Sequence, residues 1–130
     1  MIRALRTLLI LCSATAALAA ADADALLKDA LVAAAKFDAR TALELLLQAD
    51  AARPNDPAIL HRISRQYSDL TFDLADSAEQ LRCCGQALAY AKRAYALAPR
   101  DSTNALALAI CYAKIGFYSD TRTKIENSRL

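Results

Sequence analysis

The sequence predicts an all-α protein, and three observations lead to this fold class. Alanine (31) and leucine (21) supply 52 of the 130 residues, or 40%, and both residue types favour helices. Two glycines, three prolines and a single valine leave little material for turns or strands. Small residues also recur at a fixed spacing, which indicates a repeat of helix pairs.

A basic and then apolar segment precedes the helices. Arg3 and Arg6 come before an uncharged run from residue 7 to residue 21, and the small residues that end this run fit a cleavage site of the A-x-A type. The run is shorter than the roughly 20 residues that span a bilayer. We therefore expect a signal peptide over residues 1–21 and a domain over 22–130 that is exported, periplasmic or secreted, with no stable membrane span after cleavage.

The charge balance of the expected mature domain excludes one class of partner. Without Arg3 and Arg6 the chain has 14 basic and 14 acidic residues. A neutral domain lacks the basic footprint that binds nucleic acid. We therefore expect no nucleic-acid partner.

The first helix pair is predicted over residues 24–36 and 38–52. Apolar residues recur at helical spacing in both segments, and Asp24 and Asp38 stand where an N-cap belongs. Pro54 cannot continue the second helix. The first pair therefore ends at this proline.

The second pair is predicted from residue 57 to about residue 73 and from 77 to 98. Pro57 has the fixed φ that suits a first helical position. Ser77 and Gln80 have the spacing of a capping box, in which each side chain bonds the other residue's amide. We therefore expect the longer helix of this pair to begin at Ser77.

The third pair is predicted over residues 102–115 and 120–130. Asp101 and Asp120 are candidate N-caps for these two helices, and Gly116 is expected to end the first of them. The chain then ends after a short second helix. The third pair is therefore incomplete.

The repeat becomes visible when the spacings between residues are compared from one helix pair to the next. The second helices of the first two pairs share spacings of 4, 3 and 5, in the series Ala42, Leu46, Ala49, Pro54 and the series Ala87, Ala91, Ala94, Pro99. The first helices of the last two pairs share spacings of 3, 1 and 3, in Leu60, Ile63, Ser64, Tyr67 and in Ala105, Leu108, Ala109, Tyr112. Leu26 to Leu60 is 34 residues, and Leu60 to Ala105 is 45, or 11 more. Eleven residues are about three helical turns, so the longer unit keeps the same buried face.

This pattern resembles the tetratricopeptide repeat (TPR), which has a period of 34 and the same small residues, tyrosine and closing proline. The lengthened second unit, from Ile63 to Ala94, and the segment from Asn104 to Gly116 look like the family named for regulators of microtubule dynamics, here as a bacterial exported member. The resemblance implies a TPR-like helix-turn-helix solenoid of about three units, the second lengthened by 11 residues and the third incomplete.

The resemblance also implies where a partner binds. Solenoids of this kind hold a peptide or a protein segment on a concave face that is lined by the first helix of each pair. The repeat offset assigns the following residues to that face: Leu27, Leu31, His61, Arg65, Asp69, Leu106, Ile110 and Lys114. The mixture suits an apolar segment that carries an acidic group. The alternative is that neighbouring repeats cover the leucines and that the cations are only solvated.

The sequence offers no catalytic constellation. His61 is the only histidine, and Gly85 and Gly116 are too few and too far apart for a phosphate-binding loop. We therefore expect a non-enzymatic protein without a cofactor or a metal site.

Three cysteines follow the expected signal peptide. Cys83 and Cys84 lie near the start of the fourth predicted helix, and Cys111 lies towards the end of the fifth. Adjacent antiparallel helices would bring these ends together, which allows a disulfide between Cys84 and Cys111 in an exported protein. Inert buried thiols, and metal or redox chemistry, are the alternatives.

A second function is a structural or assembly role. Repeat proteins need a capping unit, and none follows the short last helix. Apolar residues at this end of the chain would stay exposed and favour a homodimer or docking to another protein: Ile115, Phe117, Ile125 and Leu130.

Overall fold

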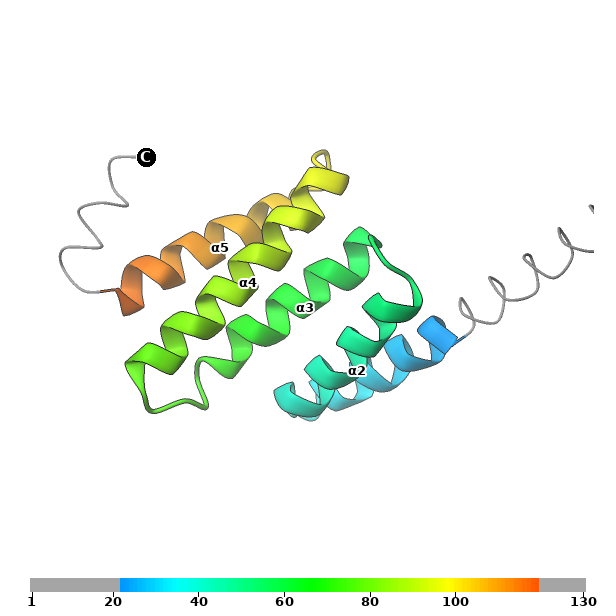
Figure 1. Ribbon diagram of the computed structural model, residues 1–130, viewed down its shortest axis with the longest axis horizontal. Helices are drawn as coiled ribbons and strands as arrows, with labels where there is room; N and C mark the ends of the chain where they lie inside the picture. Colours follow the sequence, from blue (N-terminus) through cyan, green and yellow to red (C-terminus); the bar gives the residue numbers. More distant parts are fainter. Residues whose placement is uncertain (1–21, 120–130) are drawn as a thin grey trace, which may run out of the picture.

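A computed structural model describes residues 22–119, and this part of the chain is helical without strands. A helical segment over residues 22–35 is followed by four helices (Figure 1), whose bounds are α2 (Ala39–Ala52), α3 (Pro57–Leu70), α4 (Ser77–Leu97) and α5 (Ser102–Tyr118). The all-α prediction is confirmed. The predicted signal peptide and the predicted helix over residues 120–130 lie outside the described residues.

Helices that follow one another in the chain pack side by side. α3 packs against α2 and α4, α4 packs against α5, and α3 also reaches α5 (Figure 1). This arrangement of helix pairs is consistent with a helical solenoid. Within residues 22–119, no helix is both long and apolar enough to cross a membrane.

An aspartate begins each of the four labelled helices. The side chains of these N-caps accept hydrogen bonds from backbone amides of the first turn, at Asp38, Asp56, Asp76 and Asp101. Such bonds satisfy amide groups that have no partner within the helix. Asp24 was also expected to be a cap, but residues 22 and 23 are already helical, so Asp24 lies inside the first segment.

The predicted capping box at the start of α4 is wrong by one residue. Asp76 is the N-cap and accepts from the Glu79 amide at 2.9 Å. The Gln80 side chain instead donates to the carbonyl oxygens of Thr71, at 3.1 Å, and Leu74, at 2.8 Å. Gln80 therefore holds the loop between α3 and α4, whose carbonyl groups would otherwise lack these donors.

Two predicted helix ends also differ from the structure. α3 ends at Leu70, about three residues before the predicted end. α5 continues through Gly116 to Tyr118, and Ser119 is its C-cap. Glycine ends a helix by adopting a left-handed conformation, and neither glycine has a positive φ here. Gly116 is therefore an ordinary helical residue.

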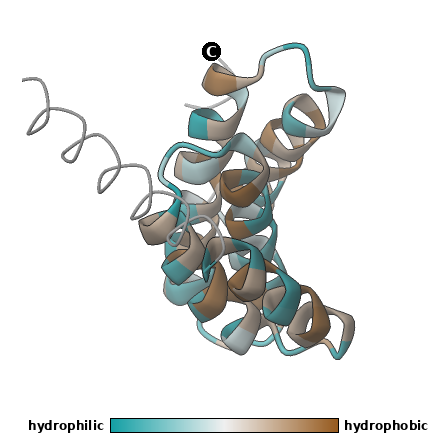
Figure 2. Cartoon of the chain, turned by 90° about the vertical axis from the view of Figure 1, so that its right-hand side faces the viewer, coloured by the Kyte–Doolittle hydropathy of each residue, from teal (hydrophilic) through white to brown (hydrophobic). Residues whose placement is uncertain are grey.

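The small residues of the repeat form the core, as the spacing predicted. The alanines of both second helices are buried, namely Ala42, Ala49, Ala87, Ala91 and Ala94. Two clusters of buried residues result, one around α2 and α3 and one between α4 and α5, and Tyr67 packs against both. Ala105 and Ala109 are exceptions, because these two repeat positions on α5 are exposed. Figure 2 shows that hydrophobic and hydrophilic residues alternate along the helices.

Candidate functional site

A groove between α3 and α5 brings together six of the eight residues that the repeat offset assigned to one face. Its volume is about 410 Å³, and the six residues are His61, Arg65, Asp69, Leu106, Ile110 and Lys114. Leu106 and Ile110 are large apolar side chains that remain exposed. Positions 45 residues apart in the sequence therefore meet across one groove.

A second groove, of about 560 Å³, lies between the segment 22–35 and α3 and contains Leu31. Arg65, Asp69 and Phe72 line both grooves, so the grooves adjoin along α3. We call the surface that residues 22–35, α3 and α5 form around the two grooves the first-helix face. Leu27 does not line either groove; it is half-buried and packs against the core cluster of α2 and α3.

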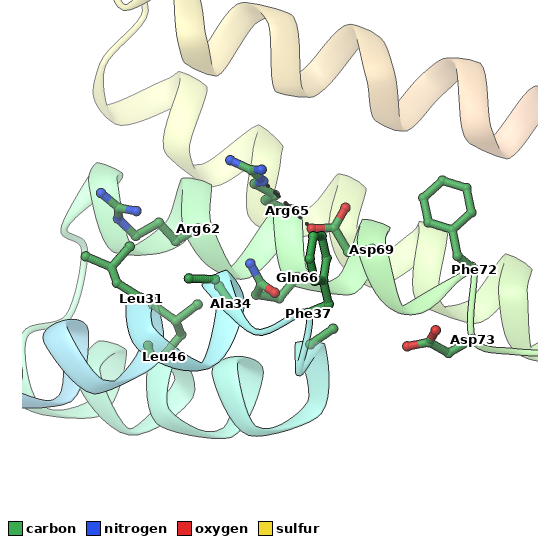
Figure 3. Close-up of a pocket in the computed structure, with 13 residues that line it drawn as sticks. Leu31, Ala34, Phe37, Leu46, Arg62, Arg65, Gln66, Asp69, Phe72 and Asp73 are labelled. Atoms are coloured by element: carbon green, nitrogen blue, oxygen red, sulfur yellow. Dashed lines mark ion pairs between the residues drawn. The ribbon is translucent and has the colours of Figure 1, made fainter.

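The centre of the first-helix face carries an ion pair. Arg65 Nε lies 3.7 Å from Asp69 Oδ2, one turn further along α3, and the two side chains are largely solvated (Figure 3). Exposed pairs of this kind contribute little to stability, at most about 1 kcal/mol. Both groups can therefore turn to a partner at small cost to the fold.

Lys114 differs from the role that the sequence suggested. Its Nζ donates to the Ser68 carbonyl oxygen at 2.6 Å and to Thr71 Oγ1 at 3.1 Å, and it lies 4.0 Å from the centre of the Phe72 ring. The ammonium group thus sits at the carboxyl end of α3, where the helix dipole favours a cation. Lys114 lines the groove but holds α5 to the end of α3.

His61 forms part of the apolar lining of the groove between α3 and α5. The side chain is half-buried, and its buried Nδ1 has no hydrogen-bond partner among residues 22–119. Burial, with a smaller contribution from the nearby charge of Arg62, lowers the pKa of His61 below 6.5, although Asp101 opposes this shift. His61 is therefore neutral at pH 7 and adds no charge to the face.

The family model for Regulator of microtubule dynamics protein 1-3 matches residues 22–130 of the chain. The chain belongs to this family. Comparisons with curated proteins and with solved structures find no match. The match covers every helix of the structure, so both grooves lie within the family domain.

Within residues 22–119, Cys83, Cys84 and Cys111 are free thiols in the structure, and the disulfide considered between Cys84 and Cys111 stays a prediction. Cys84 and Cys111 are buried, and burial raises the pKa of both thiols. Cys111 Sγ lies 3.5 Å from the hydroxyl oxygen of Ser64, which donates to the Ala87 carbonyl oxygen at 2.8 Å. A raised pKa lowers the fraction of reactive thiolate at a given pH.

Residues 22–119 of this family member hold no cluster of three or more histidine, cysteine or acidic side chains that could bind a metal ion. The titratable groups of the first-helix face are also spread over several turns rather than gathered around one reacting position.

The groove residues that sequence reasoning missed include two exposed phenylalanines and two charged residues, namely Phe37, Phe72, Arg62 and Asp73. Phe37 and Phe72 are 93% and 73% exposed. Both follow the end of a first helix, and the repeat offset addressed only positions within helices. A phenylalanine between charged residues in a predicted turn, as in Lys36-Phe37-Asp38, was the signal that could have identified the first of them.

Proposed function

We propose that the protein is a non-enzymatic protein–protein interaction scaffold that binds a segment of another protein on the first-helix face. One observation carries this proposal: residues from α3 and α5 that the repeat pattern assigned to a common face line one groove. The groove combines exposed apolar side chains with a few charges, as binding sites do. An apolar segment with an acidic group, facing Arg65, fits this lining.

Selection from a library of random peptides tests the proposal. Binders are selected on the purified protein, and their affinities are measured by calorimetry for the natural chain and two variants. Leu106→Glu places a charge in the groove and is expected to weaken binding at least about tenfold, as loss of a central apolar contact does. Leu97→Glu is the matched control, because Leu97 is also exposed but lies on α4 outside both grooves.

The outcome separates a binding site from an inert surface. Selected peptides that lose affinity with Leu106→Glu and keep it with Leu97→Glu support the proposal. Selection that yields no peptide, or peptides equally sensitive to both changes, contradicts it.

A second candidate function is self-association through the C-terminal end of α5. Phe117 supports it, since this side chain is 75% exposed and packs edge-on against its neighbour Tyr118. Ile125 and Leu130, which belong to the same hypothesis, lie outside the described residues. Sedimentation of the natural chain and of Phe117→Lys tests this function: a dimer that the substitution shifts to monomer supports it, and a monomer in both contradicts it.

We also propose that residues 1–21 are removed and that the mature protein acts after export. The support is the basic and apolar pattern of this segment. N-terminal sequencing of protein from the native host should give a first residue between Ala20 and Asp22. An intact Met1 in the membrane fraction would contradict export as a soluble domain.

A further inference from the structure

Phe37 is the most exposed large apolar side chain of the described chain, and its backbone is unusual. It lies in the turn between residues 22–35 and α2, where 93% of the side chain is accessible. Its φ of 60° is in the left-handed region, which bulky residues rarely adopt and which glycine would adopt without strain. Neither packing nor the turn itself therefore accounts for a phenylalanine here.

The ring of Phe37 instead borders the groove between residues 22–35 and α3. In Figure 3 it extends from the turn towards α3, beside Gln66 and Asp69. Leu31 and Phe72 add further exposed apolar surface to the same groove. Exposed aromatic side chains that border a groove are typical anchors of a protein interface.

The charges of this groove are ordered along α3 and the turn that follows it. Arg65 and Asp69, in the middle, form the ion pair at 3.7 Å and neutralise each other. Arg62 and Asp73, towards the two ends, take part in no ion pair within residues 22–119. Figure 3 shows the arginines towards one end and the aspartates towards the other. The groove is therefore cationic at one end and anionic at the other, and its middle combines exposed apolar side chains with the neutral ion pair.

The spacing of the unpaired charges sets the size of the occupant. Arg62 lies eight residues before the end of α3 at Leu70, which is about 12 Å along the helix at 1.5 Å per residue, and Asp73 lies in the turn that follows. An extended segment of about five residues is about 16 Å long, so it covers this part of the helix and reaches the turn. The groove volume of about 560 Å³ is within the range of small-ligand pockets, so it accommodates a few side chains rather than a whole helix.

We infer that this groove binds an extended segment of about five residues that is apolar in its middle, acidic at the end near Arg62 and basic at the end near Asp73, with Phe37 as its apolar anchor. The inference rests on the proposed scaffold function and specifies the partner of one of its two grooves. Charge complementarity decides the order of the groups, because each unpaired groove charge then gains an opposite partner.

Three peptides of matched length test the inference. They are Glu-Leu-Ala-Leu-Lys, Glu-Leu-Ala-Leu-Glu and Lys-Leu-Ala-Leu-Lys, each acetylated, amidated and fluorescently labelled, and binding is followed by anisotropy. The natural protein is expected to bind the peptide with opposite end charges about fivefold more tightly than the other two, which is the effect of a favourable surface ion pair.

Charge reversal in the protein should change the preference in a defined direction. Asp73→Lys makes both ends cationic, so the peptide with two glutamates should then bind best. Arg62→Glu makes both ends anionic, so the peptide with two lysines should bind best. Such a swap follows from electrostatic complementarity, and a general loss of structure would not produce it.

The role of Phe37 is tested separately. Phe37→Ala should lower the affinity for the preferred peptide at least about tenfold, as loss of an interface anchor does. Phe117→Ala is the matched control, because Phe117 is also largely exposed but lies at the far end of α5. Circular dichroism should show all four variants folded, since none of the replaced side chains belongs to the core.

The outcomes distinguish this inference from the scaffold function. Peptides that bind without a charge preference, or preferences that do not change with Asp73→Lys and Arg62→Glu, overturn the inference and leave the scaffold function in place. The same holds if binding is lost with Leu106→Glu but not with Phe37→Ala, because the peptide then occupies the other groove. If neither these peptides nor any library peptide binds, the inference and the scaffold function are both overturned.

Discussion

Lys114 links two helices, and its replacement by methionine should destabilise the protein. The ammonium group donates to the Ser68 carbonyl oxygen at 2.6 Å and to Thr71 Oγ1 at 3.1 Å. Hydrogen bonds of charged groups contribute about 1.5–3 kcal/mol. Methionine keeps much of the apolar stem, and Ser68 O keeps the hydrogen bond from the Thr71 hydroxyl. The expected loss in the free energy of unfolding is therefore near the lower part of this range, about 2 kcal/mol.

Urea unfolding, followed by circular dichroism at 222 nm, measures this effect. For a domain of about 100 residues a loss of about 2 kcal/mol also lowers Tm by about 10 °C. Lys28→Met is the matched control, because Lys28 is exposed on the segment 22–35 and the substitution changes net charge equally. Its effect should stay within about 0.5 kcal/mol. If Lys114→Met is as stable as this control, Lys114 does not hold α5 to α3.

Three further substitutions test the core and a titrating group. Ala91→Leu should lower the free energy of unfolding by about 1–3 kcal/mol, because the site is fully buried. Ala89→Leu is the control, at an exposed position of the same helix, and should have no such effect. Equal melting temperatures of the two variants would contradict close packing at Ala91. Asn104→Ala should lower the free energy of unfolding by about 1–3 kcal/mol, because the buried side-chain amide donates to the carbonyl oxygens of Ala94 and Ala98, each at 3.4 Å. Thermal unfolding measures this loss. His61 has a lowered pKa, so the unfolded chain binds its proton more readily and stability should fall as pH decreases below 6.5. The free energy of unfolding is measured between about pH 7.5 and 5.5, above the range where carboxylates titrate. Its slope against pH should be smaller in His61→Gln than in the natural chain. An unchanged slope would show that His61 does not cause the pH dependence.

The helical architecture was predictable from the sequence because its signals are local. Helix propensity, proline and aspartate caps act over a few residues, so the order of the helix pairs could be read from composition and spacing. The buried alanines were predictable for a similar reason. Ala87, Ala91 and Ala94 share one helical face, and only small residues allow the neighbouring helix to approach that face.

Exact helix ends were less predictable, since they depend on competition between neighbouring groups. Asp76 and Ser77 are both good N-caps, and only the folded loop shows that Asp76 caps α4 while Gln80 turns to the carbonyl groups of the loop. Gly116 shows the same limit. A glycine ends a helix only where the chain turns into the left-handed region, and here it does not.

By itself the sequence determined the all-α fold, the repeat and six residues of a common groove, because the repeat period places equivalent positions on one face. Only the tertiary structure decided which of those residues are available to a partner. Lys114 is bound to the end of α3, Leu27 packs into the core, and Phe37 and Phe72 enter the grooves from turns that no helical period describes. The physical reason is that a repeat fixes the direction of a side chain on its own helix, whereas the contacts of that side chain depend on which groups the neighbouring helices and turns place beside it.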